Sequence, residues 1–413
     1  MAFFAGNIIV GYLYHALQRG IGPVGRDLRI GYLVPSLDDT TGWGRWACEF
    51  LNHIVRRGIE PVLWAPRSAE KHLSSLSFKC RAHFVLPELF DYLQSRRGMV
   101  RFKKIFDFKG SVHTDTNIHL VHSLDAHPWG IYGYLLARTL GIPHVITTHG
   151  RYGYIAYNKL IDRIVYRHII KLATKMITVS DAVRKEILKY FSSSIALQKI
   201  ETILNAVDSE HSIGGRNYPL KAGPPVIVSV TRFIPVKDIE TSLRAFNIVR
   251  EKYPDSSFLI IGPGNGLNNS YYRMIKDLID KEKIGGVKIL GRIEKAKLEG
   301  LYMEADLLLH TPRTLPDDFE AYGLIIMEAG LFGLPVVATR SGGIPEVVVH
   351  GESGILVDER DYQKAAEAIL KILEDRGMAK RLGEKGREIA LSRNWGWYVD
   401  QQKKMYDEIL SAK

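Results

Sequence analysis

Two glutamates, Glu320 and Glu328, stand eight positions apart with Gly323 between them. An apolar run follows as far as Pro335, and residues 336–339 form a short segment rich in β-branched side chains. Because Gly and Pro end helices and short β-branched runs suit parallel sheets, the order predicts a loop, a helix and a buried strand. Glu320 then lies in the loop and Glu328 lies one turn inside the helix.

Such a helix would begin with free backbone amides at Gly323, Leu324 and Ile325, which together with the positive end of the helix dipole attract phosphate. A carboxylate at Glu328 can accept hydrogen bonds from ribose hydroxyls, and one at Glu320 can accept them from a sugar. The pattern predicts a binding site for a nucleotide sugar. An ordinary turn with two solvated glutamates has the same spacing, so both interpretations stay open at this point.

The wider segment carries two recognisable motifs. Glu320, Tyr322, Gly323 and Glu328 fit E-x-(F/Y)-G-x-x-x-x-E, and residues 341–346 read S-G-G-I-P-E. Both resemble the signature of the retaining family-4 glycosyltransferases of GT-B fold, also called glycosyl transferases group 1. The resemblance extends over nearly everything from residue 28 onward.

This resemblance implies an α/β protein of GT-B fold. Two Rossmann-like, doubly wound domains would face each other across a cleft, and a C-terminal helix would return to the first domain. The implied activity is transfer of a hexosyl unit from a nucleotide-diphosphate sugar to a glycan or lipid-linked acceptor, with retained anomeric configuration. The first domain would select the acceptor and the second would hold the donor.

Arg232 and Lys237 stand five positions apart just beyond a predicted strand. The resemblance implies that this pair holds the donor diphosphate, and two cations suit that charge; a solvated basic loop is the alternative. Together with amides at the helix start, they would stabilise the leaving diphosphate. No bound metal or other cofactor is then expected, and Glu320 need not act as a covalent nucleophile.

His149 follows a predicted strand, at the sheet edge where open α/β sheets bind ligands. The resemblance places a histidine of the donor-sugar pocket at this T-H-G position. Near the first strand, Gly42 and Gly44 would let the backbone approach the donor closely, although a tight turn alone also explains them.

The run from Phe258 to Gly266 contains glycines, but it fails the dinucleotide fingerprint because Leu267 stands where a third glycine is required. We expect a glycine loop, including Gly264, to pass beneath a bound nucleotide. Arg292 and its neighbours would approach the base largely through backbone groups. Base contacts made through backbone groups leave few side chains from which the base could be identified.

A chain of 413 residues suits two domains. The predicted divisions are an extension over 1–27, an acceptor-side domain over 28–210, a linker over 211–224, a nucleotide-sugar domain over 225–391 and a crossing helix over 392–413. The predicted strands include 29–34, 59–64, 117–122, 144–148, 176–180, 225–230, 306–310, 336–339 and 355–357. The predicted helices include 129–140, 157–172, 181–190, 362–374, 378–391 and 395–410.

The formal charge is +11, and residues 1–210 hold 27 Lys and Arg against 17 Asp and Glu. Nucleic acid, an anionic membrane, a phosphorylated acceptor or plain solubility could each explain this asymmetry. A cluster of cations in the first half is interleaved with aromatic residues, a mixture suited to an anionic membrane surface; a flexible solvated loop is the alternative. The cations are Arg96, Arg97, Arg101, Lys103, Lys104 and Lys109, and the aromatic residues are Tyr92, Phe102, Phe106 and Phe108.

Cys48 and Cys80 are the only cysteines and lack metal-type spacing, so we expect a reducing cytoplasm and no metal site. The apolar stretch over 3–17 is too short to span a bilayer and lacks a basic leader. A cytoplasmic enzyme is expected, with peripheral attachment to the cytoplasmic membrane face as a further hypothesis. Two rivals remain: a basic nucleic-acid-binding module, which leaves the paired glutamates without a role, and a catalytically silent sugar-nucleotide sensor.

Overall fold

The computed structural model describes residues 28–38, 41–88, 108, 117–154, 160–190, 198–209, 223–263 and 269–412. Two sheets organise the chain, one with strand order β3-β2-β1-β4-β5-β6-β7 and one with order β10-β9-β8-β11-β12-β13. Neighbouring strands pair in parallel, as Ile30 does with Leu120 and Leu308 with Val336. The predicted α/β class with two Rossmann-like sheets is confirmed.

The first sheet consists of short apolar strands that are buried on both faces near its centre. Its strands are β1 (Leu28–Leu33), β2 (Ile59–Pro66), β3 (Arg81–Leu86), β4 (Leu120–Ser123), β5 (His144–Thr148), β6 (Lys175–Thr178) and β7 (Ile200–Thr202). Its helices are α2 (Gly42–Val55), α5 (Trp129–Leu140), α6 (Arg151–Tyr154), α7 (Leu160–Leu172) and α8 (Asp181–Leu188). The Thr41 hydroxyl caps α2 by accepting a hydrogen bond from the amide of Gly44 at 3.1 Å.

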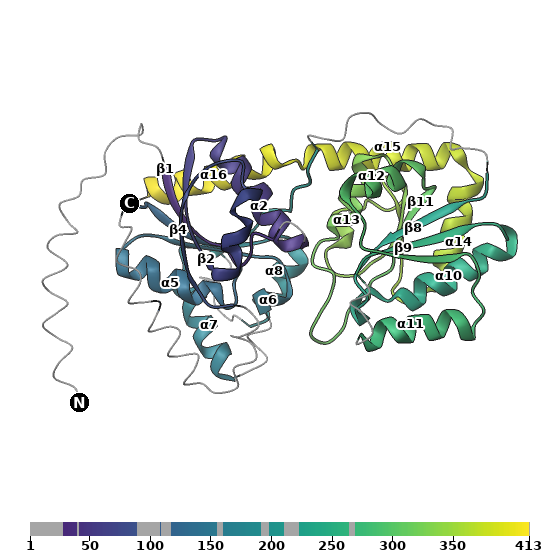
Figure 1. The fold of residues 1–413 in the computed structure, drawn as a ribbon, viewed down its shortest axis with the longest axis horizontal. Coiled ribbons are helices and arrows are strands. Elements are labelled where there is room, and N and C mark those ends of the chain that lie inside the picture. The colour runs from purple at the N-terminus through teal and green to yellow at the C-terminus, as the bar shows by residue number, and fades with distance from the viewer. Residues whose placement is uncertain are drawn as a thin grey trace, which may run out of the picture. The chain divides into compact units, whose positions relative to one another are not determined.

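The second sheet repeats the doubly wound pattern. Its strands are β8 (Val226–Val230), β9 (Ser257–Ile261), β10 (Val287–Gly291), β11 (Leu307–His310), β12 (Val336–Thr339) and β13 (Ile355–Val357). Its helices are α10 (Ile239–Lys252), α11 (Ser270–Lys281), α12 (Lys295–Glu304), α13 (Leu324–Leu331), α14 (Tyr362–Glu374) and α15 (Arg376–Ser392). Because parallel crossovers are right-handed, α10 and α11 lie on one face and α12 and α13 on the other (Figure 1).

The strand order of the second sheet reverses direction between β8 and β11. From β8 the chain moves outward through β9 to β10, and it then returns to add β11 on the other side of β8. Ligands of open α/β sheets bind outside the carboxyl ends of the strands at such a switch point. The residues that follow β8 and β11 are therefore the first candidates for a site.

The last helix, α16 (Trp395–Ser411), ends against the first sheet. The hydroxyl of Tyr406 lies 2.5 Å from Nδ1 of His122 on β4 and accepts a longer hydrogen bond from Tyr32 on β1. All three side chains are fully buried. Figure 1 shows this yellow end of the chain beside β1 and β4. The predicted return of the final helix is confirmed.

Backbone contacts group the chain into two compact units. The first comprises Met1–Thr147, His168–Lys175 and Lys403–Lys413, and the second comprises Thr148–Arg167 and Met176–Gln402. Along the chain, the strands of the first sheet precede residues 210–222 and those of the second sheet follow them; residues 210–222 themselves are outside the described residues. The predicted domain and linker boundaries therefore stay predictions. No helix within the described residues is both long and apolar enough to cross a bilayer.

Candidate active site

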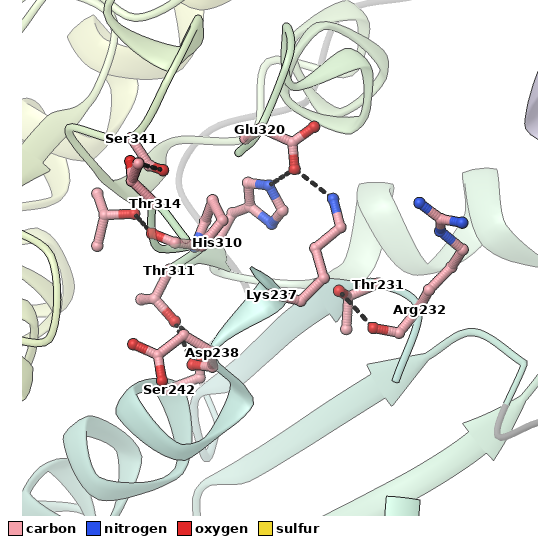
Figure 2. Close-up of polar contacts among 12 residues, drawn as sticks. Thr231, Arg232, Lys237, Asp238, Ser242, His310, Thr311, Thr314, Glu320 and Ser341 are labelled. Atoms are coloured by element: carbon pink, nitrogen blue, oxygen red, sulfur yellow. Dashed lines mark hydrogen bonds and ion pairs between the residues drawn. The ribbon is translucent and has the colours of Figure 1, made fainter. Parts of the chain in front are cut away.

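A buried polar cluster lies at the switch point of the second sheet. The carboxylate oxygen Oε2 of Glu320 accepts hydrogen bonds from the ammonium group of Lys237 and from Nε2 of His310, the latter at 3.2 Å. The side chains of Lys237 and Glu320 are 15% and 13% exposed, and that of His310 is 1% exposed. Figure 2 shows the side chains of Lys237 and His310 converging on this one oxygen.

Three different elements deliver these side chains. Lys237 ends a 3-10 turn, Pro235–Lys237, that follows β8, and His310 is the last residue of β11. Glu320 lies in the loop between β11 and α13. Because β8 and β11 are parallel neighbours, their carboxyl ends reach the same edge, and the loop brings Glu320 back over them.

Electrostatics keep Glu320 ionised. Burial alone raises the pKa of a carboxyl group, but the Lys237 ammonium and the hydrogen bond from His310 more than offset it, so the pKa of Glu320 lies far below its usual range. Burial also lowers the pKa of His310, which therefore stays neutral. A neutral imidazole beside an ionised carboxylate carries its proton on the facing nitrogen, so Nε2 of His310 donates to Glu320.

Asp238 supports the turn that carries Lys237. Its backbone has φ 44°, in the left-handed region, and its buried carboxylate accepts a hydrogen bond from the Thr241 hydroxyl at 2.8 Å and lies 3.4 Å from Nη1 of Arg313. The Arg313 amide in turn donates to the carbonyl oxygen of Val236 at 2.8 Å. The loop after β11 is thereby tied to the turn after β8.

Arg232 is exposed and stands ahead of Lys237 on the same loop (Figure 2). Within the described part of the chain, no carboxylate forms an ion pair with it. The backbone beneath it is tightly packed, because a Cβ on Gly262 would lie 1.8 Å from the carbonyl oxygen of Thr231. The structure thus presents one cation already paired with Glu320 and a second that faces solvent.

Helix α13 begins as the sequence predicts. Gly323 adopts φ 86°, a conformation that favours glycine, and precedes the first helical residue. Among the residues that the structure describes, none accepts a hydrogen bond from the amides of Leu324 and Ile325. Glu328 is half-buried one turn further along. These features are typical of an anion-binding site at the N-terminus of a helix.

The S-G-G turn closes against the loop that carries Glu320. The Gly343 amide donates to the carbonyl oxygen of Glu320 at 2.8 Å, and a Cβ on Gly342 would lie 2.1 Å from that same oxygen. Any larger residue at position 342 would push the loop away. The motif that ends at Glu328 and the S-G-G-I-P-E motif, whose nearest residues are 13 positions apart in the sequence, therefore contact each other in the structure.

The turn that contains His149 approaches the same loop. A Cβ on Gly150, which has φ 128°, would lie 2.8 Å from the Cβ of Ala321, and Arg151 lies 3.8 Å from Asp318. All of these residues belong to the second compact unit. His149 is therefore close in space to the Glu320 segment, and its contact with a sugar stays a prediction.

The other predicted donor-binding residues are less informative. A Cβ on Gly44 would lie 2.1 Å from the carbonyl oxygen of Asp38, which explains that glycine by a tight turn, whereas a Cβ on Gly42 would meet nothing within 4 Å. Arg292 is exposed just after β10. Gly264 lies outside the described residues. A ligand role for these four residues stays a prediction.

One part of the predicted membrane patch is wrong. Phe108 is 1% exposed and its ring packs edge-on against Tyr132 at 5.0 Å, so it belongs to the core of the first unit because an apolar ring gains most from burial there. The cations of the patch, Arg96, Arg97, Arg101, Lys103, Lys104 and Lys109, lie outside the described residues. No cluster of three or more metal-ligating side chains occurs among the residues that are described.

Sequence reasoning missed His310, Asp238 and Arg313. A signal for His310 was present, because a polar residue ends an otherwise apolar parallel strand, the same reason that singled out His149. The pairing of Asp238 with Arg313 gave no local signal, since it depends on the neighbouring positions of β8 and β11.

Comparison with known proteins shows which family the chain belongs to. Residues 216–389 match the model of the family described as glycosyl transferases group 1, and residues 40–211 match that described as glycosyltransferase family 4. A GDP-mannose-dependent alpha-(1-6)-phosphatidylinositol monomannoside mannosyltransferase of Mycolicibacterium smegmatis is 31% identical over 270 residues, covering 63% of this chain and 69% of that protein. An uncharacterized glycosyltransferase of Methanocaldococcus jannaschii is 25% identical over 77% of this chain and 83% of its own length.

Solved structures share the fold. Sucrose-phosphate synthase from Thermosynechococcus elongatus superimposes with a TM-score of 0.74 at 20% identity, covering 94% of this chain and all of that one. HepE of Anabaena, solved with UDP-glucose, has a TM-score of 0.71 at 18% identity and covers 92% of this chain and 100% of its own.

Proposed function

Because this chain belongs to the group 1, family 4 glycosyltransferases of GT-B fold, we propose that it moves a hexosyl unit from a nucleotide-diphosphate sugar to an acceptor with retention of configuration. The observation that carries the proposal is the cluster of Glu320, Lys237 and His310 at the switch point of the second sheet. Beside it, helix α13 begins with amides suited to phosphate.

The donor would bind with its charge toward the cations and the helix start. Arg232 and the amides of Leu324 and Ile325 would hold the diphosphate, since exposed donors at a helix N-terminus are suited to anions. Glu328 would accept hydrogen bonds from the ribose, and Glu320 would accept them from the sugar hydroxyls. HepE was solved with UDP and with UDP-glucose, which supports a nucleotide-sugar donor for this fold.

The chemical step separates charge. The bond between the anomeric carbon and the diphosphate oxygen breaks, the bond to the acceptor oxygen forms, and the acceptor's proton passes to an oxygen of the leaving phosphate. Negative charge grows on the diphosphate, where Arg232, Lys237 and the helix amides would stabilise it. His149 would contact the sugar. Since protein cations supply the positive charge, we propose that no divalent metal is required.

The acceptor is proposed to be a glycan or a lipid-linked saccharide. The mycobacterial relative is named for a phosphatidylinositol mannoside acceptor, which supports lipid-linked chemistry. The excess of cations in the first 210 residues also suits an anionic acceptor or surface. We accordingly propose a cytoplasmic enzyme that works at the inner face of the membrane and does not bind nucleic acid.

A donor screen followed by a transfer assay tests the proposal. UDP, GDP and ADP sugars are first compared by thermal shift, because a ligand at about 100 times its Kd stabilises by roughly 2.7 kcal/mol. The stabilising donor is then incubated with lipid-linked and saccharide acceptors, and NMR of the first-formed linkage reports its configuration. Glu320→Ala, which removes both acceptor oxygens, serves as the control of low activity.

The outcomes separate the rival functions. Transfer with retained configuration supports the proposal, and an inverted linkage contradicts retention. Binding of a donor without turnover toward any acceptor would indicate a sugar-nucleotide sensor. Salt-dependent binding to random DNA or RNA without donor affinity would indicate a nucleic-acid-binding module.

A further inference from the structure

Lys237 faces two anions that compete for it. In the structure its ammonium group donates to Oε2 of Glu320. In the proposed reaction it must also reach the donor diphosphate, whose charge is larger than that of one carboxylate. Lysine is a flexible point charge with three donors, so it can turn part or all of its hydrogen bonding from the carboxylate to the phosphate.

Turning Lys237 away would leave Glu320 without its cation. The Glu320 side chain is only 13% exposed, and an ionised buried group that loses its partner is strongly destabilised. Without a second contact the carboxylate would reorient or take up a proton. Either change would spoil its contact with a sugar hydroxyl at the moment when the donor arrives.

His310 provides a contact that does not depend on the donor. It is the last residue of β11, a strand paired with β8 on one side and β12 on the other, and its side chain is 1% exposed. Its Nε2 lies 3.2 Å from Oε2 of Glu320. A side chain on a central strand with no room to move holds its partner more rigidly than a loop residue does.

The contact also selects one oxygen of the carboxylate. Lys237 and His310 both donate to Oε2, and among the residues that the structure describes none donates to Oε1 of Glu320. Figure 2 shows Oε1 on the opposite side of the carboxylate from Lys237 and His310. Oε1 is thus the oxygen left for a ligand.

We infer that His310 is a positioning residue, which anchors Oε2 of Glu320 while Lys237 turns to the donor diphosphate, so that Oε1 stays aimed at a sugar hydroxyl. The inference deepens the proposed function and rests on it. His310 thus acts on the sugar part of the donor through Glu320, and it makes no contact with the nucleotide.

Two substitutions of His310 test this assignment. His310→Phe fills the same space without a donor, and His310→Gln places an amide N–H near the position of Nε2. We expect His310→Phe to lower kcat for the nucleotide sugar about ten- to a hundredfold, the usual effect of losing a hydrogen bond to a charged group. Its Kd for the free nucleoside diphosphate, which has no sugar, should stay within about twofold of the wild-type value. His310→Gln should recover most of the activity.

His350→Phe is the matched control. His350 also belongs to the second unit and accepts a hydrogen bond from the Leu356 amide at 3.0 Å, so this variant measures the effect of losing a histidine elsewhere, and its kcat should be unchanged. All variants are compared by isothermal titration with the nucleoside diphosphate and by initial rates with the nucleotide sugar.

The inference is overturned if His310→Phe turns over the nucleotide sugar as fast as wild type. It is also overturned if His310→Phe loses kcat and nucleoside-diphosphate affinity together and His310→Gln restores neither, because that pattern indicates general disruption of the site. If wild-type protein transfers sugar from no donor, the proposed function itself fails and this inference fails with it.

Discussion

The ammonium group of Lys237 donates a hydrogen bond to the carboxylate of Glu320, 83 positions later in the chain. The two side chains come from different strand ends and neutralise each other at the switch point of the second sheet. Each would serve a different part of the donor, the diphosphate in one case and the sugar in the other. The pairing therefore brings two parts of the proposed machinery into direct contact.

Replacing Arg232 and Lys237 distinguishes their effects on catalysis from their effects on stability. Arg232→Ala and Lys237→Ala should each lower kcat more than donor affinity, by about a hundredfold, because the charge on the diphosphate grows in the transition state. Lys237→Ala should also lower the melting temperature, since it strips a buried carboxylate of its partner, whereas Arg232→Ala should not, because Arg232 is exposed. Steady-state kinetics and thermal melts of both variants check this, and equal melting temperatures would contradict the role of the pair.

Glu328→Ala tests the ribose contact. The lost hydrogen bond to a charged group is worth about 1.5 to 3 kcal/mol, so nucleotide affinity should fall roughly ten- to a hundredfold. Titration calorimetry with the nucleoside diphosphate measures it, and Glu328→Gln, which keeps one acceptor oxygen, should lose less. A folded Glu328→Ala protein that binds the nucleotide normally would rule out the ribose assignment.

Removal of divalent ions should leave activity intact. The proposed charge stabilisation uses Arg232, Lys237 and backbone amides, so initial rates in a chelator should match those in added magnesium or manganese. The measurement needs protein dialysed against chelator beforehand. An absolute requirement for a divalent cation would show that protein cations do not suffice.

The stability of the first unit should depend on Asp125. Burial raises the pKa of this carboxyl, which lies just after β4 with Oδ1 2.7 Å from the Ala126 amide, to about 8. Between the ordinary carboxyl pKa of about 4 and the raised value, the folded chain holds a proton that the unfolded chain has lost. Stability should therefore fall as pH rises through this window, by up to about 1.4 kcal/mol per pH unit, and level off above it.

Asp125→Asn isolates that effect. The amide cannot ionise, so the variant should gain stability relative to wild type as pH rises from 5 to 8, measured by denaturant unfolding at each pH. Asp255→Asn, at an exposed carboxylate, should track wild type throughout. A difference between Asp125→Asn and wild type that does not change with pH would argue against a buried, protonated carboxyl.

Attachment to membranes remains a prediction about residues outside the described structure. Replacing Arg101, Lys103 and Lys104 with Ser should release the protein from anionic vesicles at low salt, because each cation contributes about 1 kcal/mol near such a surface. Nucleotide binding should stay unchanged. Co-sedimentation at low and high salt measures this, and wild-type protein that stays in the supernatant at low salt would contradict the hypothesis.

Local signals predicted the elements around the site well. The helix after Gly323 and the strand Val336–Thr339 appear as expected, because glycine in the left-handed region and a short β-branched run act over a few residues only. The S-G-G motif was recognised, but its contact with the Glu320 carbonyl was not, since that contact depends on how two loops fold back on each other.

Pairings across the sheet could not be predicted in the same way. His310 meets Glu320 and Asp238 meets Arg313 only because β11 returns to lie beside β8, and no single segment encodes that strand order. The local sequence at Asp238 also favours a role that the structure does not show. An aspartate before a helix favours a side-chain cap, yet here its carboxylate turns to Thr241 and Arg313 and caps no helix amide. The short edge strand β3, with Arg81 and His83 in it, was missed because it lacks a clear apolar pattern.

The burial of Tyr406 against Tyr32 and His122 has a consequence for biosynthesis. Domains usually fold in order as the chain leaves the ribosome, the N-terminal one first. Here Tyr32 on β1 and His122 on β4 gain their buried partner Tyr406 only when residues 403–411 have emerged. The packing of the first sheet around Tyr32 and His122 is therefore completed by a segment that is made after the strands of both sheets.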